Sequence, residues 1–540
     1  MQTEGRAHKG SFTAAKRNFI PFLLIFLSAV LLALAFPKTD ISLFAWIGLI
    51  PLMFVLDGRD LAGSFKAGYL CGVLFFALTV SWMVYVTVFG AILMILYLGL
   101  YYALFAVAYC LFSRSKLLLK MFLLPAVWVV LEYVKAYLIG GFDWASLGHT
   151  QYKNLALIQI AEFTGYYGVS YLIVAANIVL KDTVAVLSNK NTKTAPKEAL
   201  SVIAILLVII LTVIGFGRSV LRMQDSRKKI SVGIIQGNID QDLKWFESAW
   251  EDILEKHILL TKLAAKENPD LIIWPETSFP GFLILKDDKY QYSPNGVNFD
   301  NNERFYSRVK QLAYDIGIPI LFGVVSEENG KYYNSAVLLS NEGKLIGKYN
   351  KLHLVPFGEY IPLRIIFPFL ASIVPIDDFT SGNKFTVLSL PGKNNQEVMA
   401  KFSPLICFED TVARLARRFI GGGAEFFVNM TNDGWFKDTK APFMHMQSSV
   451  FRSIENRKYL VRCTNTGVSN FINDKGKILD FVKDDKGKST YVTGVVVADV
   501  YLNSKKTLYS KYGDLFAIFC IVFVLFGIVL EIKNYSKIGG

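Results

Sequence analysis

The chain has 540 residues, of which 53% are hydrophobic and 14% aromatic, and its mean hydropathy is +0.38. This composition is too apolar for an ordinary soluble protein of that length, so it predicts membrane spans beside at least one full-sized soluble domain. The net charge of +13 suits either nucleic acid or an anionic membrane surface. Because the sequence shows no basic stripe interleaved with aromatic residues, we assign the charge to the membrane and expect no nucleic-acid partner.

Apolar stretches long enough to cross a bilayer as helices fill the first part of the chain and recur once near its end. The sixth is the weakest, since "GVSYLIVAANIVL" needs flanking residues to reach that length, and the second is also short. After a cytoplasmic segment at 1–18, the first seven predict a helical membrane domain at 19–217. The predicted spans are 19–36, 41–57, 66–89, 91–113, 118–138, 166–181, 199–216 and 514–531.

Lysine and arginine gather on one side of these spans, which predicts their orientation. The connections on the other side are poor in basic residues, and 139–165 has only Lys153. With an even number of spans, both termini are expected in the cytoplasm and the region 228–502 outside. The first stretch also resembles a cleavable signal peptide ending at "ALA", although its apolar run is long for one and cleavage would leave the later orientation unchanged.

The region 228–502 has a different pattern, in which β-branched runs alternate with helical periodicity. It opens with the strand pattern "KISVGIIQGNI" and continues with the helical pattern "WFESAWEDILEKHILLTKLAAKE". Short buried strands such as "PDLIIWPE" and "IPILFGVVSE" follow, and a helix is expected at 443–458. Strands alternating with helices predict an α/β domain with sheets covered by helices.

Five cysteines are scattered through the chain, three of them in strongly apolar segments where a packing role is ordinary. No CxxC or HExxH pattern occurs, so we expect no metal site, no redox site and no cofactor. The cysteines are Cys71, Cys110, Cys407, Cys463 and Cys520.

Three short segments place reactive groups where predicted strands end. Glu276 in "IIWPETSFP" is either a helix N-cap or a general base, because open α/β sheets place their sites at strand ends. Lys351 in "KYNKLHLVPFGEYIP" lies among apolar residues, in a loop that prolines and a glycine stiffen around Glu359. Cys407 in "PLICFED", taken alone, is a packing residue whose acidic neighbours disfavour reactivity. Together the three segments supply a base, a cation and a nucleophile, which is what thiol catalysis requires.

The order of these segments resembles the catalytic triad of the nitrilase superfamily, whose members act on carbon–nitrogen bonds through a thioester on an αββα sandwich. With its seven apolar stretches before the domain and one after it, nearly the whole chain resembles the bacterial apolipoprotein N-acyltransferase family. "IIQGNIDQDLKW", "NMTNDGWFKD" and "ENRKYLVRCTNTGVS" match further segments of the family. Phe408 stands where a tyrosine is common after the nucleophile, which keeps the ring and loses the hydroxyl.

The resemblance implies a multi-span α-helical membrane domain joined to a nitrilase-like α/β sandwich. Cys407 would be the nucleophile, Glu276 the general base and Lys351 the cation that stabilises thiolate and oxyanion. Glu359 would orient Lys351 or assist proton transfer. The substrate-binding residues expected from the resemblance are Trp245, Phe357, Phe408, Glu409 and Trp435.

The resemblance also implies the reaction and its place. An acyl chain would pass from a phospholipid to the α-amino group of the N-terminal diacylglyceryl-cysteine of a lipoprotein, by a ping-pong mechanism through a thioester, as the last step of lipoprotein maturation. The partners would be the phospholipid donor, the diacylated lipoprotein acceptor and the bilayer. The location would be the bacterial inner membrane, with the catalytic domain on the periplasmic side.

Residues 362–375, "PLRIIFPFLASIVP", are too apolar for a solvated loop. They are either a buried core segment or a lid that dips into lipid through Ile365, Ile366, Phe367 and Phe369 and gates acyl entry.

Two other functions fit parts of the sequence. A membrane-tethered amidase or nitrilase would use the same triad and hydrolyse its thioester with water, but tethering needs only one span. A scaffold or transporter would not require the triad. The spans also carry few charges, chiefly Glu132 and Lys135, which disfavours a solute pathway.

Overall fold

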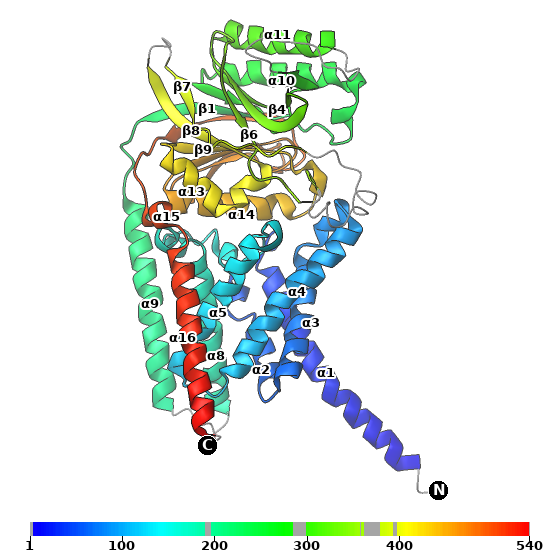
Figure 1. Cartoon of the computed structure of the whole chain (residues 1–540), viewed down its shortest axis with the longest axis vertical. Helices are drawn as coiled ribbons and strands as arrows, with labels where there is room; N and C mark the ends of the chain where they lie inside the picture. Colours follow the sequence, from blue (N-terminus) through cyan, green and yellow to red (C-terminus); the bar gives the residue numbers. More distant parts are fainter. Residues whose placement is uncertain are drawn as a thin grey trace. The chain divides into compact units, whose positions relative to one another are not determined.

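The two sequence patterns form two units of the structure. The computed structural model describes residues 4–188, 196–284, 299–356, 358–360, 379–392 and 397–538. One unit consists of Met1–Ser219 and Asp514–Gly540, and the other is Val220–Gly513 (Figure 1). The second unit is therefore an insertion between two apolar helices of the first.

The first unit is built of apolar helices. Six helical segments in the described part of the chain are long and apolar enough to cross a membrane: Leu61–Thr79, Val88–Leu111, Leu117–Gly140, Tyr167–Val186, Lys197–Arg222 and Leu515–Lys533. Shorter apolar helical segments occur at Phe19–Leu34, Ser42–Leu56 and Leu155–Thr164. The helices of this unit are α1 (Glu4–Leu34), η1 (Ser42–Trp46), α2 (Ile50–Leu56), α3 (Leu61–Thr79), η2 (Ser81–Tyr85), α4 (Val88–Leu111), α5 (Leu117–Tyr137), η3 (Leu138–Gly140), η4 (Leu147–Gln151), α6 (Leu155–Ile158), α7 (Ala161–Thr164), α8 (Tyr167–Ser188), α9 (Pro196–Arg222) and α16 (Leu515–Ile538).

The stretch 41–57 differs from the single helix that its apolar composition suggests. It forms the 3-10 helix η1 and, after a bend, the seven-residue helix α2. At 1.5 Å per residue α2 is about 10 Å long, roughly a third of the hydrocarbon thickness of a bilayer.

Two of the three charged residues of α5, Glu132 and Lys135, hold the irregular segment that follows it. Lys135 Nζ donates to Trp144 O at 2.9 Å and to Ser146 Oγ at 3.1 Å. Glu132 Oε1 accepts the Leu147 backbone N–H at 2.8 Å. Both charges thus have partners within their own unit.

The second unit is a four-layer sandwich. Its first sheet has the order β13-β1-β2-β4-β5-β6, with β3 paired to β4, and its second has the order β12-β11-β10-β9-β8-β7. Helices α10 and α11 cover the first sheet, and α13 and α14 cover the second (Figure 1). The first sheet contains β1 (Lys229–Gln236), β2 (Leu271–Ile273), β3 (Phe282–Ile284), β4 (Ile320–Glu328), β5 (Lys331–Leu339), β6 (Leu345–Asn350) and β13 (Gly494–Tyr501). The second contains β7 (Leu388–Pro391), β8 (Val398–Ile406), β9 (Phe426–Thr431), β10 (Tyr459–Thr464), β11 (Asn470–Ile472) and β12 (Ile478–Phe481).

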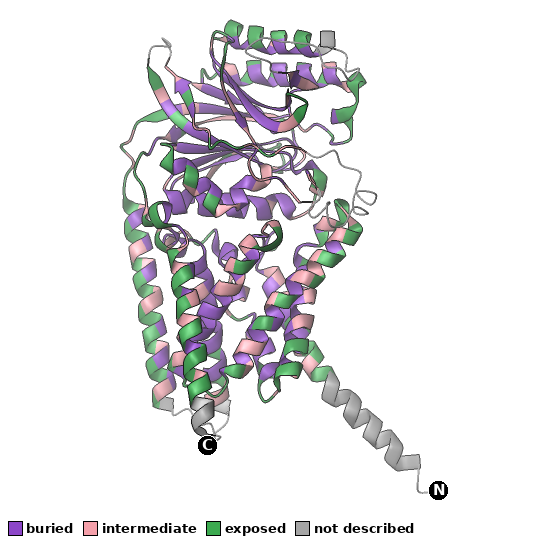
Figure 2. Cartoon of the chain, in the orientation of Figure 1, coloured by how far each residue is buried: buried purple, intermediate pink, exposed green. Residues whose placement is uncertain are grey.

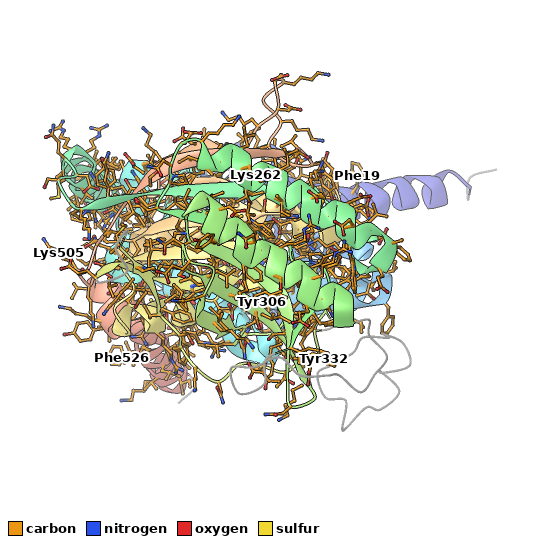
Figure 3. All side chains as sticks on the ribbon, turned by 90° about the horizontal axis from the view of Figure 1, so that it is seen from above. Phe19, Lys262, Tyr306, Tyr332, Lys505 and Phe526 are labelled. Atoms are coloured by element: carbon orange, nitrogen blue, oxygen red, sulfur yellow. The ribbon has the colours of Figure 1, made fainter. Side chains whose placement is uncertain are left out.

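Helices α10, α11 and α13 of the sandwich each have a buried and an exposed face, whereas α14 is buried on all sides. Figure 2 shows the strands of both sheets mostly buried, exposed outer faces on α10 and α11, and α14 buried along nearly its whole length. Figure 3 looks onto α10 and α11, which lie side by side and are joined by ion pairs from Arg304 and Arg308 to Glu251. The helices of this unit are η5 (Leu243–Trp245), η6 (Glu247–Ala249), α10 (Trp250–Ala265), α11 (Phe299–Ile316), η7 (Cys407–Thr411), α13 (Ala413–Gly421), η8 (Asp433–Phe436), α14 (Ala441–Asn456) and α15 (Leu508–Tyr512). The αββα sandwich predicted for this region is confirmed.

Candidate active site

Glu276 lies just beyond β2, where the backbone of β4 comes unusually close. Trp274 fixes the end of the strand, since it is fully buried and its Nε1 donates to Thr261 Oγ1 at 2.8 Å. In β4, Gly323 faces the turn, and a Cβ added there would lie 2.5 Å from Pro275 O. The Glu276 carboxylate is buried and accepts the Asn334 amide at 2.7 Å and the Asn432 backbone N–H at 2.7 Å.

Lys351 follows β6 and lies between two carboxylates. Its Nζ is 2.9 Å from Glu359 Oε1 and 3.7 Å from Glu276 Oε1, and the residue is 1% exposed. The Asn334 amide also donates to Glu359 Oε1, at 2.9 Å, so one side chain bridges both acids. Glu359 Oε2 accepts the Val355 N–H at 2.8 Å, which closes the loop 351–360, hereafter the lysine loop.

The charges of Lys351, Glu276 and Glu359 determine the protonation of these side chains. Burial acts to lower the pKa of Lys351, but the carboxylates of Glu359 and Glu276 outweigh it and raise that pKa above its ordinary value. Burial raises the pKa of Glu276, and the Lys351 ammonium opposes this shift. The site therefore combines a firmly charged lysine with a carboxylate that takes up a proton more readily than an exposed one.

Cys407 directly follows β8, as the first residue of η7, and has a strained backbone conformation. Its φ of +52° lies in the left-handed region, which residues other than glycine rarely adopt. Its carbonyl accepts Asn429 Nδ2 at 3.0 Å and faces His445 Nε2 at 3.2 Å. Burial raises the pKa of the Cys407 thiol well above its ordinary value, Glu276 raises it further and Lys351 opposes them. The contacts bring the three predicted residues together: Lys351 lies 3.7 Å from Glu276, and one carboxylate, that of Glu409, accepts the backbone N–H groups next to Cys407 and next to Lys351.

Glu409 connects the lysine loop to the nucleophile strand. It is fully buried, and its Oε1 accepts the N–H groups of Leu352 and His353 at 2.7 and 3.0 Å. Its Oε2 accepts the Ile406 N–H at 2.7 Å, and the Tyr349 hydroxyl donates to both oxygens. Burial raises the pKa of Glu409 to about 7, and these donors oppose that shift. Sequence reasoning grouped Glu409 with the substrate-binding residues, whereas in the structure its carboxylate contacts three backbone N–H groups and the Tyr349 hydroxyl.

The other predicted substrate-binding residues are partly exposed or lie outside the described part of the chain. Trp245 and Trp435 are about half exposed. The Phe408 ring stacks on the His353 ring with centroids 5.8 Å apart. Phe357 and the apolar segment 362–375 fall outside the residues that the structure describes.

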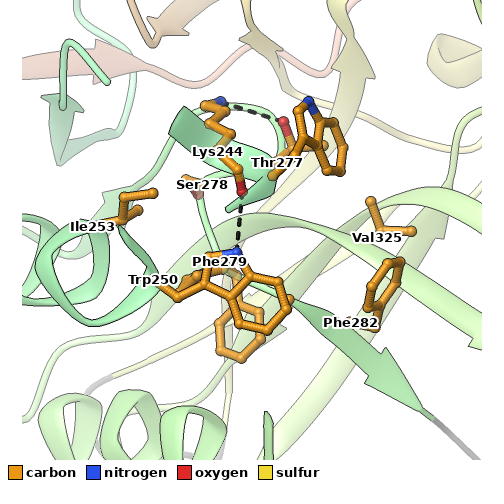
Figure 4. A pocket seen from close by; sticks show the side chains of 11 residues that line it. Lys244, Trp250, Ile253, Thr277, Ser278, Phe279, Phe282 and Val325 are labelled. Carbon is orange, nitrogen blue, oxygen red and sulfur yellow. Dashed lines mark hydrogen bonds between the residues drawn. The ribbon is translucent and has the colours of Figure 1, made fainter. Parts of the chain in front are cut away.

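A small pocket beside Glu276 contains Trp245 and the buried Lys244 (Figure 4). Lys244 Nζ donates to Glu276 O and Thr277 Oγ1, both at 3.3 Å, and Trp250 Nε1 donates to Lys244 O at 3.2 Å. Burial lowers the pKa of Lys244 to about 8. The lining of the pocket is mostly apolar or aromatic and consists of Lys244, Trp245, Trp250, Ile253, Thr277, Ser278, Phe279, Pro280, Gly281, Phe282 and Val325.

Sequence reasoning missed several residues that shape the site, namely Lys244, Asn334, Asn429 and His445. Asn334 and Asn429 are buried amides inside strands, and His445 is a fully buried histidine in α14. A polar residue in an otherwise apolar strand or helix face was the available signal. Within the described residues, no group of three or more His, Cys, Asp or Glu side chains is arranged to hold a metal ion.

Comparisons with known proteins match both units. Residues 28–179 match the family model for the apolipoprotein N-acyltransferase N-terminal domain, and residues 231–506 match that for carbon-nitrogen hydrolase. An apolipoprotein N-acyltransferase of Geobacter metallireducens is 36% identical over 518 residues, which covers 93% of each chain. One of Methylococcus capsulatus is 31% identical over 474 residues, covering 84% of this chain and 86% of that relative. Among solved structures, Saccharomyces cerevisiae Nit3, a member of the nitrilase superfamily, is 18% identical with a TM-score of 0.36, covering 51% of this chain and 90% of its own.

These matches confirm the resemblance predicted from the three motifs and the apolar stretches. The protein is an acyltransferase of the multi-pass membrane type, and its relatives connect it with the N-acylation of lipoproteins. The chain belongs to the apolipoprotein N-acyltransferase family, and it joins the N-terminal domain of that family to a carbon-nitrogen hydrolase domain.

Proposed function

We propose that the protein transfers an acyl chain from a phospholipid to the α-amino group of the diacylglyceryl-cysteine of a lipoprotein, by a ping-pong mechanism through a thioester on Cys407. The observation that carries the proposal is the buried cluster in which Lys351 Nζ lies 2.9 Å from Glu359 and 3.7 Å from Glu276, and which Glu409 joins to the strand end that precedes Cys407. A cation fixed beside a thiol and a proton-accepting carboxylate suits covalent acyl transfer.

In the first half-reaction, Glu276 accepts the thiol proton as the Cys407 sulfur attacks the ester carbonyl of the phospholipid. The tetrahedral oxyanion is stabilised by Lys351 Nζ and the backbone N–H of Phe408. The intermediate collapses with cleavage of the carbon–oxygen bond, and the leaving lysophospholipid oxygen takes the proton from Glu276. A thioester remains on Cys407.

In the second half-reaction, the lipoprotein amine attacks the thioester carbonyl and passes a proton to Glu276. The carbon–sulfur bond breaks, the amide is released and the thiol regains its proton. Because the thiol pKa is raised in the resting site, the thiol stays protonated until Glu276 removes the proton during attack.

Glu359 and Glu409 act on this machinery as positioning residues. Glu359 holds the Lys351 ammonium in place through the 2.9 Å contact, and Glu409 joins the lysine loop to Ile406 at the end of β8. Trp245, Phe408 and Trp435 are assigned to substrate contact. Trp245 and Trp435 are the exposed aromatic groups among them, and Trp245 lines the pocket beside Glu276.

The location follows from the substrates. Extracting an acyl chain from lipid into water costs about 0.8 kcal/mol per CH₂, so a reaction centre near the bilayer is favoured. The distribution of basic residues supports a catalytic domain on the periplasmic side and both termini in the cytoplasm.

The covalent mechanism is tested by incubating the purified full chain with phospholipid alone and measuring its intact mass. We expect one added acyl chain that hydroxylamine removes and that is absent from the Cys407→Ala variant. Cys110→Ala, which removes a cysteine from α4, is the matched control and should keep the adduct. Formation of no adduct by an active preparation would reject the thioester.

The same adduct separates transfer from hydrolysis. Adding a diacylated lipopeptide should discharge it as an amide, whereas water alone should leave it in place. Rapid discharge by water without amide formation would instead favour a membrane-tethered carbon–nitrogen hydrolase.

A further inference from the structure

The carbonyl of Cys407 is held from two different elements of the sandwich. Asn429 Nδ2, from β9, donates to it at 3.0 Å, and His445 Nε2, from α14, lies 3.2 Å away. Both side chains are fully buried. Neither belongs to the triad, yet both act on the peptide group of the nucleophile.

His445 reaches this carbonyl as a charged imidazolium. Its Nδ1 lies 2.9 Å from Asp433 Oδ1 and its Nε2 lies 2.8 Å from Asp410 Oδ1. Since each ring nitrogen faces a carboxylate, and a neutral imidazole has only one N–H, both nitrogens act as donors. Burial lowers the pKa of His445, but Asp410 and Asp433 outweigh it and raise that pKa to about 9, against opposition from Arg462.

Arg462 completes the charge balance of this buried group. Its Nη1 lies 2.6 Å from Asp410 Oδ2, and its Nη2 lies 3.8 Å from Asp433 Oδ2. The Ser449 hydroxyl also donates to Asp410. The carboxylates of Asp410 and Asp433 thus balance the charges of His445 and Arg462. This arrangement holds the His445 ring in one orientation next to the Cys407 carbonyl.

The peptide bond between Cys407 and Phe408 links the Cys407 carbonyl to the Phe408 N–H. The cis peptide among the described residues is Pro37–Lys38, so the bond between Cys407 and Phe408 is trans. In a trans peptide the C=O and the N–H point in opposite directions. Holding the Cys407 oxygen therefore fixes the direction of the Phe408 N–H, and hydrogen bonds to the oxygen also polarise that N–H as a donor.

We infer that His445 and Asn429 are positioning residues that aim the Phe408 N–H at the oxyanion of the acyl-transfer intermediates. The inference rests on the proposed function, in which this N–H stabilises the oxyanion. It also explains how Cys407 keeps its left-handed backbone conformation, since the two donors hold the peptide group that follows it.

The test compares two reactions of the same sulfur. Acylation by phospholipid passes through an oxyanion, whereas alkylation by iodoacetamide displaces iodide without one. In His445→Gln we expect acylation, measured by intact mass in a single turnover, to fall about 10²-fold, in the range for losing one oxyanion donor. Alkylation of Cys407 should stay close to the unmodified rate, and the phospholipid concentration for half-maximal acylation should not change.

Asn429→Leu provides a second variant, because it removes the other donor to the same carbonyl without touching the buried charges. It should show the same selective loss of acylation. Ser453→Ala is the matched control, since this buried serine lies one turn further along α14 and its hydroxyl donates to the Ser449 backbone carbonyl rather than to the charged group. This control should acylate at the unmodified rate.

The outcomes are distinct. Unchanged acylation in both variants would overturn the inference while leaving the thioester mechanism in place. An equal loss of acylation and alkylation would show that His445 acts on the reactivity of the thiol or on folding. That result would also overturn the inference. If the unmodified protein forms no acyl adduct although iodoacetamide labels Cys407, the proposed function fails and the inference fails with it.

Discussion

Lys351 is the residue on which the charge balance of the site depends. It lies between Glu276 and Glu359, and Asn334 donates to both acids. A buried ion pair contributes little net stability, but removing one partner leaves an uncompensated charge and costs about 3–5 kcal/mol. The lysine therefore matters to the fold as well as to the oxyanion.

We predict that Lys351→Met abolishes acyl transfer and destabilises the protein more at pH 8 than at pH 5. Burial already raises the pKa of Glu276, and loss of the ammonium raises it further. A carboxyl with a raised folded-state pKa contributes stability at low pH that is lost as the pH rises through that pKa. Thermal unfolding of the full chain in detergent at both pH values measures the difference.

The double variant Lys351→Met with Glu359→Gln is the control for this charge argument. Removing one of the two acids should restore part of the stability at pH 8 without restoring activity. A stability deficit that is equal at both pH values would contradict the explanation.

The reactive residues could be predicted from the sequence, but their partners could not. Glu276, Lys351 and Cys407 carry chemistry in their side-chain type and follow recognisable strands. Asn334 contacts Glu276 across 58 positions of the chain, and His445 reaches the Cys407 carbonyl across 38. An amide or imidazole becomes part of the site only when the fold brings it to its partner. The local sequence pattern therefore does not identify these residues.

Gly323 shows how one strand sets the place of a catalytic group on another. A Cβ there would lie 2.5 Å from Pro275 O and 2.6 Å from Thr277 N, both backbone atoms that cannot rotate away. In β1, by contrast, a Cβ on Gly233 would meet its nearest neighbours at 3.5 Å, an ordinary contact. The two glycines lie in the same sheet and differ in what faces them.

We predict that Gly323→Ala lowers acyl transfer by about 10²-fold, because the added methyl group displaces the Glu276 turn, and small misplacements of catalytic groups have effects of this size. Gly233→Ala should keep near-normal activity. Single-turnover acylation of both variants is the measurement, and equal activities would show that the close approach is unimportant.

At the scale of elements, both periodicity and apolar composition predicted helices, but apolar composition did not show where a helix is interrupted. The predicted helix at 443–458 occurs as α14, Ala441–Asn456, and the helical pattern after Trp245 contains α10, Trp250–Ala265. The stretch 41–57 was predicted as one span and contains a bend. Pro51 at the start of α2 was the signal, since proline is favoured in the first helical turn.

The whole molecule is predicted to have one orientation in the membrane. The number of spans and the placement of basic residues put the catalytic unit outside and both termini inside. A cysteine at the exposed position Asp485, in a Cys407→Ala chain, should react with a membrane-impermeant maleimide in spheroplasts. A cysteine appended after Gly540 should react only after the membrane is disrupted, and the reverse pattern would contradict the predicted topology.

The pairing of β1 with β13 delays completion of the first sheet during protein synthesis. Lys229 pairs with Tyr501 and Gln236 with Gly494, so the first strand of the catalytic unit completes its ladder with the last. These partners are separated by 258–272 residues, which a ribosome synthesises in roughly 13–55 s at about 5–20 residues per second. For that interval β1 presents an open edge, the kind of edge that attracts other strands. Helix α16, which starts at Leu515, is synthesised directly after β13. Closure of the sheet and membrane insertion of the last helix therefore both occur at the end of protein synthesis.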